Sequence, residues 1–95
     1  MKIKMVHKDR KSVEFTMEGI DVSILQILQS FLFKDGRVRN VAFRQSHPIL
    51  KTTSFWVEVS KGDPEEVIIE ACKKAIEEVD DLKKEILASL EGEIG

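Results

Sequence analysis

The chain has 95 residues, of which 42% are apolar and 34% charged, so it has the composition of a single folded domain and not of a disordered segment. Its one cysteine excludes an internal disulfide, and no apolar run reaches the length of a membrane span. The net charge of −2 hides an asymmetry: residues 1–62 hold 11 basic and 6 acidic side chains, whereas residues 63–95 hold 4 and 11. With no secretory signal at the N-terminus, we expect a cytoplasmic protein.

Residues 2–18 are predicted to form an antiparallel hairpin. Apolar residues alternate with polar ones in both halves, and residues 9–11 supply the turn. The inward positions are expected to be Ile3, Met5, Val13, Phe15 and Met17.

Five basic residues cluster in this hairpin, and they allow two interpretations, a binding site and a purely structural role. They are Lys2, Lys4, Lys8, Arg10 and Lys11. A nucleic-acid site would use such a cluster to contact phosphates. Lysines are also common on edge strands, where they keep a hairpin soluble, and we favour this interpretation because no aromatic residues interleave the cluster.

A first helix is predicted over residues 21–35, with Asp21 as its N-cap and Asp35-Gly36 as its stop. No charged residue occurs from Val22 to Phe33, and the polar remainder is Ser23, Gln26, Gln29 and Ser30. The apolar arc consists of Ile24, Leu25, Ile27, Leu28, Phe31 and Leu32. A helix that is apolar nearly all round is buried on two sides, so one border should face the sheet and the other a partner. The sequence does not say whether the border at Leu25 and Leu32 or that at Ile27 and Phe31 faces the sheet.

Two further strands are predicted over residues 38–44 and 54–60, joined by a connection over 45–53 that contains His47-Pro48. The element order is then ββαββα. It predicts one domain over residues 1–95 of the α+β class, with an antiparallel four-stranded sheet and two helices on one face.

The last helix, predicted over residues 63–91, is too long for so small a domain. Asp63 and Pro64 give it a strong start signal. At 1.5 Å per residue it spans about 40 Å, so part of its apolar stripe should extend beyond the chain's own core. The stripe residues that we expect at an interface with another chain are Ile76, Val79, Leu82, Ile86, Leu87 and Leu90, together with the apolar arc of the first helix.

The sequence holds no catalytic motif. His7 and His47 have no metal-binding partner nearby in the sequence, and Cys72 lies on an apolar helix face. The acidic residues of the last helix are interpreted as a solvated face. We therefore predict no catalytic residue, no metal site and no cofactor.

Three segments resemble subunit L of archaeal RNA polymerase, in the α-like small-subunit family related to the bacterial α dimerisation domain. They are residues 19–28, residues 43–50 with His47-Pro48, and Gly62-Asp63-Pro64 before the acidic helix. The positions that correspond to the family motif are Gly19, Asp21, Ser23, Phe43, His47, Pro48, Gly62 and Pro64. The chain departs from the family pattern at Val22, Ser23 and Gln26, so helix packing carries over better than polar contacts.

The resemblance implies a non-catalytic subunit of DNA-directed RNA polymerase. Family members pair through their two helices with a larger α-like polymerase subunit of the D type, and the heterodimer starts assembly of the large subunits, without direct DNA contact. The alternatives are a small RNA-binding module that uses its sheet face, and a homodimeric interaction domain. A small hydrolase is disfavoured by the lack of a nucleophile–base pair.

Overall fold

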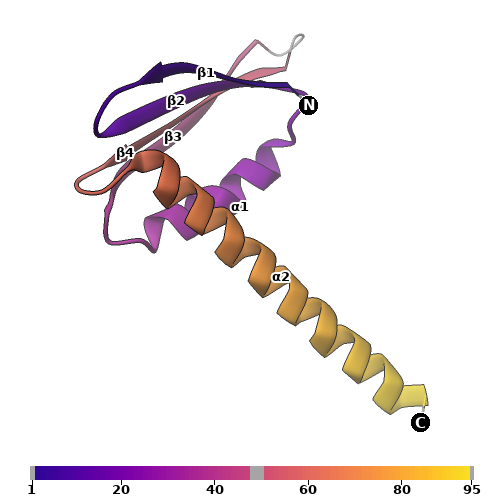
Figure 1. The fold of residues 1–95 in the computed structure, drawn as a ribbon. Coiled ribbons are helices and arrows are strands. Elements are labelled where there is room, and N and C mark those ends of the chain that lie inside the picture. The colour runs from indigo at the N-terminus through magenta and orange to yellow at the C-terminus, as the bar shows by residue number, and fades with distance from the viewer. Residues whose placement is uncertain (1, 48–50, 95) are drawn as a thin grey trace.

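A computed structural model describes residues 2–47 and 51–94 (Figure 1). The elements are β1 (Lys2–Lys8), β2 (Ser12–Glu18), α1 (Val22–Phe33), β3 (Val38–His47), β4 (Thr52–Val59) and α2 (Pro64–Ile94). This is the predicted ββαββα order. None of the described helices is both long and apolar enough to cross a membrane.

The four strands form one antiparallel sheet in the order β1-β2-β4-β3. Apolar residues lie opposite one another in the middle of the sheet. Phe15 on β2 pairs with Phe55 on β4, and Phe55 pairs in turn with Phe43 on β3. The predicted α+β sheet with two helices on one face is confirmed: both helices lie on the same side of the sheet in Figure 1. Helix α1 packs against β3 and α2, and α2 also contacts β2 and β4.

The core lies between the helices and the middle of the sheet. Its buried apolar members are Val13, Met17, Leu25, Leu32, Val41, Phe55, Val57, Val59, Val67 and Ala71. By contrast, every residue of edge strand β1 is exposed, and the helices pack mainly on β2, β3 and β4.

A bulge in β1 decides where its side chains point. Met5 pairs with Phe15, whereas His7 pairs with Glu14, so Val6 is the extra residue. Because the bulge resets the alternation, Lys8 falls on the helix side of the sheet, where its ammonium lies 3.0 Å from the carboxylate of Glu65 on α2.

Helix α1 ends at Phe33 with Lys34 as its C-cap, slightly before the predicted stop at Asp35-Gly36, and positive φ angles among the described glycines occur at Gly19 and Gly62. The turn after α1 is held by Asp35, whose carboxylate accepts a bond from the Arg37 backbone N–H at 2.9 Å and is bridged by the Arg37 guanidinium. The same guanidinium also bonds Glu70, which ties this turn to α2. The predicted start is confirmed, since Asp21 Oδ1 accepts a bond from the Ser23 N–H at 2.9 Å.

The predicted bounds of the connection over residues 45–53 are wrong, because both flanking strands are longer than predicted. Strand β3 continues to His47 and β4 begins at Thr52, with Gln45 opposite Thr53. The residues that extend these two strands are polar, and they pair through backbone hydrogen bonds. Without an alternation of apolar and polar residues, the sequence gives no sign that the strands continue. Pro48 lies outside the described residues.

Helix α2 gives the molecule its shape. It has 31 residues, hence a length of about 46 Å, and Figure 1 shows it crossing α1 and running far beyond the sheet. The radius of gyration is 16.3 Å, against about 13 Å for a compact domain of this size. The N-terminus of α2 is capped as predicted: Asp63 Oδ1 accepts a bond from the Glu65 N–H at 3.0 Å.

Candidate dimerisation surface

The two borders of α1 have different surroundings. Leu25 and Leu32 are 1% and 0% exposed and lie in the chain's own core. Ile24 and Ile27, on the other border, are 55% and 53% exposed. The expectation that Leu25 and Leu32 belong to an intermolecular interface is therefore corrected: they face the sheet, and Ile24 and Ile27 face outward.

Leu28 and Phe31 lie between these extremes. Both are half-buried and pack against the core, so each has one side covered by its own chain and one side open. The ammonium of Lys34 stands 4.7 Å from the centre of the Phe31 ring, which places a cation at this edge of the helix.

A groove of about 240 Å³ separates the outward side of α1 from α2. Its lining is apolar and consists of Ile24, Ile27, Leu28, Cys72, Ala75 and Ile76. Burial raises the pKa of the Cys72 thiol, which keeps it protonated and weakly reactive. The groove thus offers an apolar floor with no charged group.

A second hollow, of about 210 Å³, lies one turn earlier on α2 and is lined by Phe15, Glu65, Ile68 and Ile69. Ile69, Cys72 and Ile76 are spaced i, i+3 and i+7, so the two hollows follow one face of α2 end to end.

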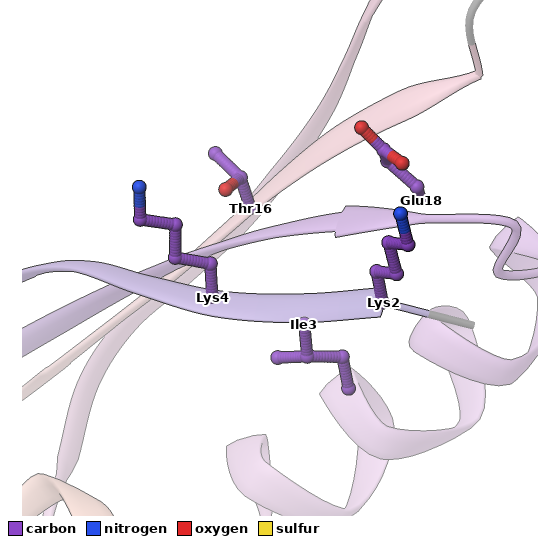
Figure 2. A pocket seen from close by; sticks show the side chains of 5 residues that line it. All are labelled: Lys2, Ile3, Lys4, Thr16 and Glu18. Carbon is purple, nitrogen blue, oxygen red and sulfur yellow. The ribbon is translucent and has the colours of Figure 1, made fainter.

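Strand β1 carries exposed apolar side chains and pairs with β2 at Phe15, which lines this second hollow. Ile3 and Met5 are 56% and 46% exposed, and Met5 lies opposite Phe15. Figure 2 shows Ile3 on the helix side of β1, whereas Lys2, Lys4, Thr16 and Glu18 rise from the opposite face around an open hollow of about 430 Å³. Ile3, Met5 and Ile69 were not among the residues expected at an interface, although lysines alternate with apolar residues in β1 and so indicate that one side of this strand is apolar.

The third part of the surface is the end of α2 that extends beyond the sheet. Ala75 is the last half-buried residue, and every residue from Ile76 to Gly92 is exposed. We call residues 76–92 the overhang, which is about 26 Å long. Its large apolar side chains are 49–68% exposed: Ile76, Val79, Leu82, Ile86, Leu87 and Leu90.

Together the α1–α2 groove, the hollow beside β1 and the stripe of the overhang form what we call the apolar face. Burying the exposed half of a large aliphatic side chain is worth about 1 kcal/mol, so this face represents a large free energy that the chain alone does not gain. Exposed apolar surfaces of this extent mark protein–protein interfaces.

The sequence profile of the family described as the RNA polymerase Rpb3/Rpb11 dimerisation domain matches residues 12–85. The chain belongs to this family.

Relatives of the Rpb3/Rpb11 family match over nearly the whole chain. DNA-directed RNA polymerase subunit Rpo11 of Pyrococcus abyssi is 34% identical over 94 residues, which cover 96% of this chain and 95% of the relative. Rpo11 of Thermoplasma volcanium is 27% identical, over 97% of this chain and 79% of the relative. The chain is thus an RNA polymerase subunit of the Rpo11, or L, type that carries a dimerisation domain.

The fold agrees with this family. The crystal structure of DNA-directed RNA polymerase subunit L from Thermoplasma acidophilum superposes with a TM-score of 0.85 at 22% identity, covering 95% of this chain and 89% of that one. The long helix and the sheet order are therefore features of the fold.

Among the described residues, the positions that carry the resemblance to this family build local structure. Gly19 and Gly62 adopt positive φ angles of 75° and 84°. Asp21 caps α1 with Ser23, and the buried Pro64 begins α2. Phe43 packs against the core, and His47 ends β3.

The opposite face of the sheet is polar. Trp56 is half-buried there, and its register neighbours are Glu14 on β2 and Ala42 on β3. An RNA-binding sheet stacks bases on several exposed aromatic residues, and this face offers Trp56 beside a carboxylate. Across residues 2–47 and 51–94, no group of three His, Cys, Asp or Glu side chains could hold a metal ion.

Proposed function

We propose that the chain is a non-catalytic assembly subunit of a cytoplasmic DNA-directed RNA polymerase. In this role its apolar face pairs with an α-like polymerase subunit of the D type, and the heterodimer is the platform on which the large subunits assemble. Nucleotidyl transfer then belongs to the other subunits of the complex, and the chain needs no cofactor and no direct DNA contact of its own.

The observation that carries the proposal is the overhang. A helix that extends about 26 Å beyond its own sheet with an apolar stripe is unfavourable in water. The stripe begins at Ile76, which also lines the α1–α2 groove. The family description supports a partner of related fold, since one dimerisation domain is named for two proteins, Rpb3 and Rpb11.

Co-expression with a tagged α-like subunit tests the proposal. Ile27→Glu and Leu82→Glu each place a carboxylate on the apolar face, where an unpaired buried charge costs several kcal/mol, and both should abolish co-purification. Lys4→Glu is the matched control, because Lys4 stands on the polar face of the sheet (Figure 2). Co-purification of both apolar-face variants at the level of the control would show that another surface makes the contact.

The alternatives have distinct outcomes in the same set of proteins. A discrete dimer of the chain alone that the α-like subunit does not displace would favour the homodimeric domain. Nanomolar, salt-sensitive RNA binding that Lys4→Glu weakens would favour the RNA-binding module.

A further inference from the structure

The face of the sheet that points away from both helices carries a row of polar side chains across all four strands. Residues that pair across neighbouring strands point to the same face, so the register defines the row. Its members are Lys4 on β1, Thr16 on β2, Ser54 on β4 and Arg44 on β3. The row thus has a cation on each edge strand and two hydroxyl side chains on the central strands between them.

A hollow of about 430 Å³ opens at the β1 end of this row. Figure 2 shows Lys2, Lys4, Thr16 and Glu18 standing around it. Glu18 lies opposite Lys2 in the register and offsets part of its charge. The two cations of the row are not offset in this way, since neither Lys4 nor Arg44 forms an ion pair within residues 2–47 and 51–94.

The spacing of these two cations fits an extended chain. Neighbouring strands are about 4.8 Å apart, so three steps separate Lys4 from Arg44 by about 14 Å. In an extended segment, residues i and i+4 lie on one face and are also about 14 Å apart, at roughly 3.4 Å per residue. Two carboxylates with this spacing reach both cations, and residue i+2 lies over the hydroxyls of Thr16 and Ser54.

We propose that this row, which we call the sheet-face site, binds an extended acidic segment of another protein. That segment carries Asp or Glu at positions i and i+4 and a small or hydrogen-bonding residue at i+2. The sheet-face site and the apolar face lie on opposite sides of the sheet, so the chain can hold the segment and the α-like subunit at the same time. The proposal does not depend on the proposed function, because no member of the row belongs to the apolar face.

The other charges on this face favour a protein segment over a nucleic acid. Glu14, Glu18 and Glu58 stand on the same face as the row and repel a continuous chain of phosphates. Trp56, half-buried beside Glu14, is the chain's one tryptophan, whereas RNA-binding sheets stack bases on several aromatic residues. A protein segment meets only the two cations with charge and places neutral side chains near the carboxylates.

Short peptides test the proposal with the full chain. The probe is Ser-Glu-Thr-Ser-Thr-Glu-Ser, which has glutamates at i and i+4 and reads the same in both directions. One control peptide replaces both glutamates by glutamine, and another keeps the charge but places the glutamates at i and i+2. Binding is measured at low salt from the amide chemical shifts of the isotope-labelled chain, which report the dissociation constant and the location together. The probe should bind about fivefold or more tightly than either control and shift the amides along the row.

Substitutions in the chain tie the binding to the two cations. Lys4→Gln and Arg44→Gln should each weaken binding of the probe to the level of the control peptides. Arg10→Gln is the matched control, because it removes an exposed cation of the hairpin turn and should leave the dissociation constant within about twofold. Arg44→Glu should prefer a peptide in which one of the two glutamates is replaced by lysine.

Equal binding of the three peptides would overturn the proposal, as would chemical shift changes that lie outside the row. Tighter binding of a single-stranded uridine octamer that displaces the probe would also overturn it, in favour of a nucleic-acid site. Lys4→Gln combined with Arg44→Gln should still co-purify with the α-like subunit. The sheet-face site and the proposed function can therefore fail independently.

Discussion

Leu25 and Ile27 stand two residues apart on α1 and should respond to substitution in opposite ways. Leu25 is 1% exposed and lies in the core, whereas Ile27 is 53% exposed and lines the α1–α2 groove. Leu25→Ala leaves a cavity in the core and should cost about 3 kcal/mol of folding free energy. For a domain of this size that corresponds to a fall in melting temperature of roughly 12–24 °C.

Ile27→Glu should act on binding instead. In the chain alone the carboxylate reaches water, and the loss is limited to the buried half of the Ile27 side chain, about 1 kcal/mol. In the heterodimer the carboxylate is enclosed in an apolar contact, at a cost of about 3 kcal/mol or more. A cost of that size raises the dissociation constant about 150-fold.

Two assays separate the effects: thermal unfolding of the chain alone by circular dichroism, and titration with the α-like subunit below the melting temperature of each variant. We expect Leu25→Ala to melt early and bind within a few-fold of wild type, and Ile27→Glu to melt nearly normally and fail to bind. The assignment of the two borders is refuted if Ile27→Glu binds like wild type, or if Leu25→Ala leaves the melting temperature unchanged.

Further predictions concern the overhang, α1 and the turn that follows it. Truncation after Val79 should leave the melting temperature of the isolated chain within a few degrees of wild type and abolish co-purification with the α-like subunit; equal loss of both would mean that the overhang packs on its own sheet. Gln29→Glu should destabilise the chain by about 1–3 kcal/mol, because Gln29 Nε2 donates to the Val41 carbonyl at 3.1 Å and a carboxylate cannot, with Gln29→Met as the uncharged control in denaturant unfolding. Hydrogen bonds from Arg37 lower the pKa of Asp35 to about 2, so its stabilising contribution is present above about pH 4 and is lost as the pH falls toward 2. Asp35→Asn should make the free energy of unfolding less dependent on pH between about pH 2 and pH 4. An unchanged pH dependence would contradict the stabilising role of the Asp35–Arg37 interaction.

The sequence pattern predicted those helices and strands in which one face is buried and the other is exposed at regular intervals. The alternation of residues 12–18 and of residues 54–60 placed two strands correctly, and the capping residues Asp21 and Asp63 placed two helix starts. The overhang was predictable from arithmetic alone, because a helix of this length cannot fit on a small sheet.

The remaining features depend on contacts between segments that are distant in the sequence. Which border of α1 faces the sheet is decided by its packing on β3, since both borders have the same apolar chemistry. Gln29 is one of the few polar residues of α1, and its side chain donates a hydrogen bond to the backbone of β3, which its type and position in the sequence do not indicate. Ile3 and Met5 are exposed because β1 is an edge strand, which follows from the strand order and not from the local pattern.

Hydrogen–deuterium exchange tests the central claim most directly, by comparing the chain alone with its complex with the α-like subunit. In the chain alone, the backbone amides of residues 76–92 belong to an exposed helix end with few stabilising contacts and should exchange quickly. In the complex the account predicts slower exchange in residues 76–92 and in α1, and unchanged exchange in the β2–β4 ladder, which is protected in both states. Equal exchange of residues 76–92 with and without the partner would contradict the claim that this helix end is the dimerisation surface.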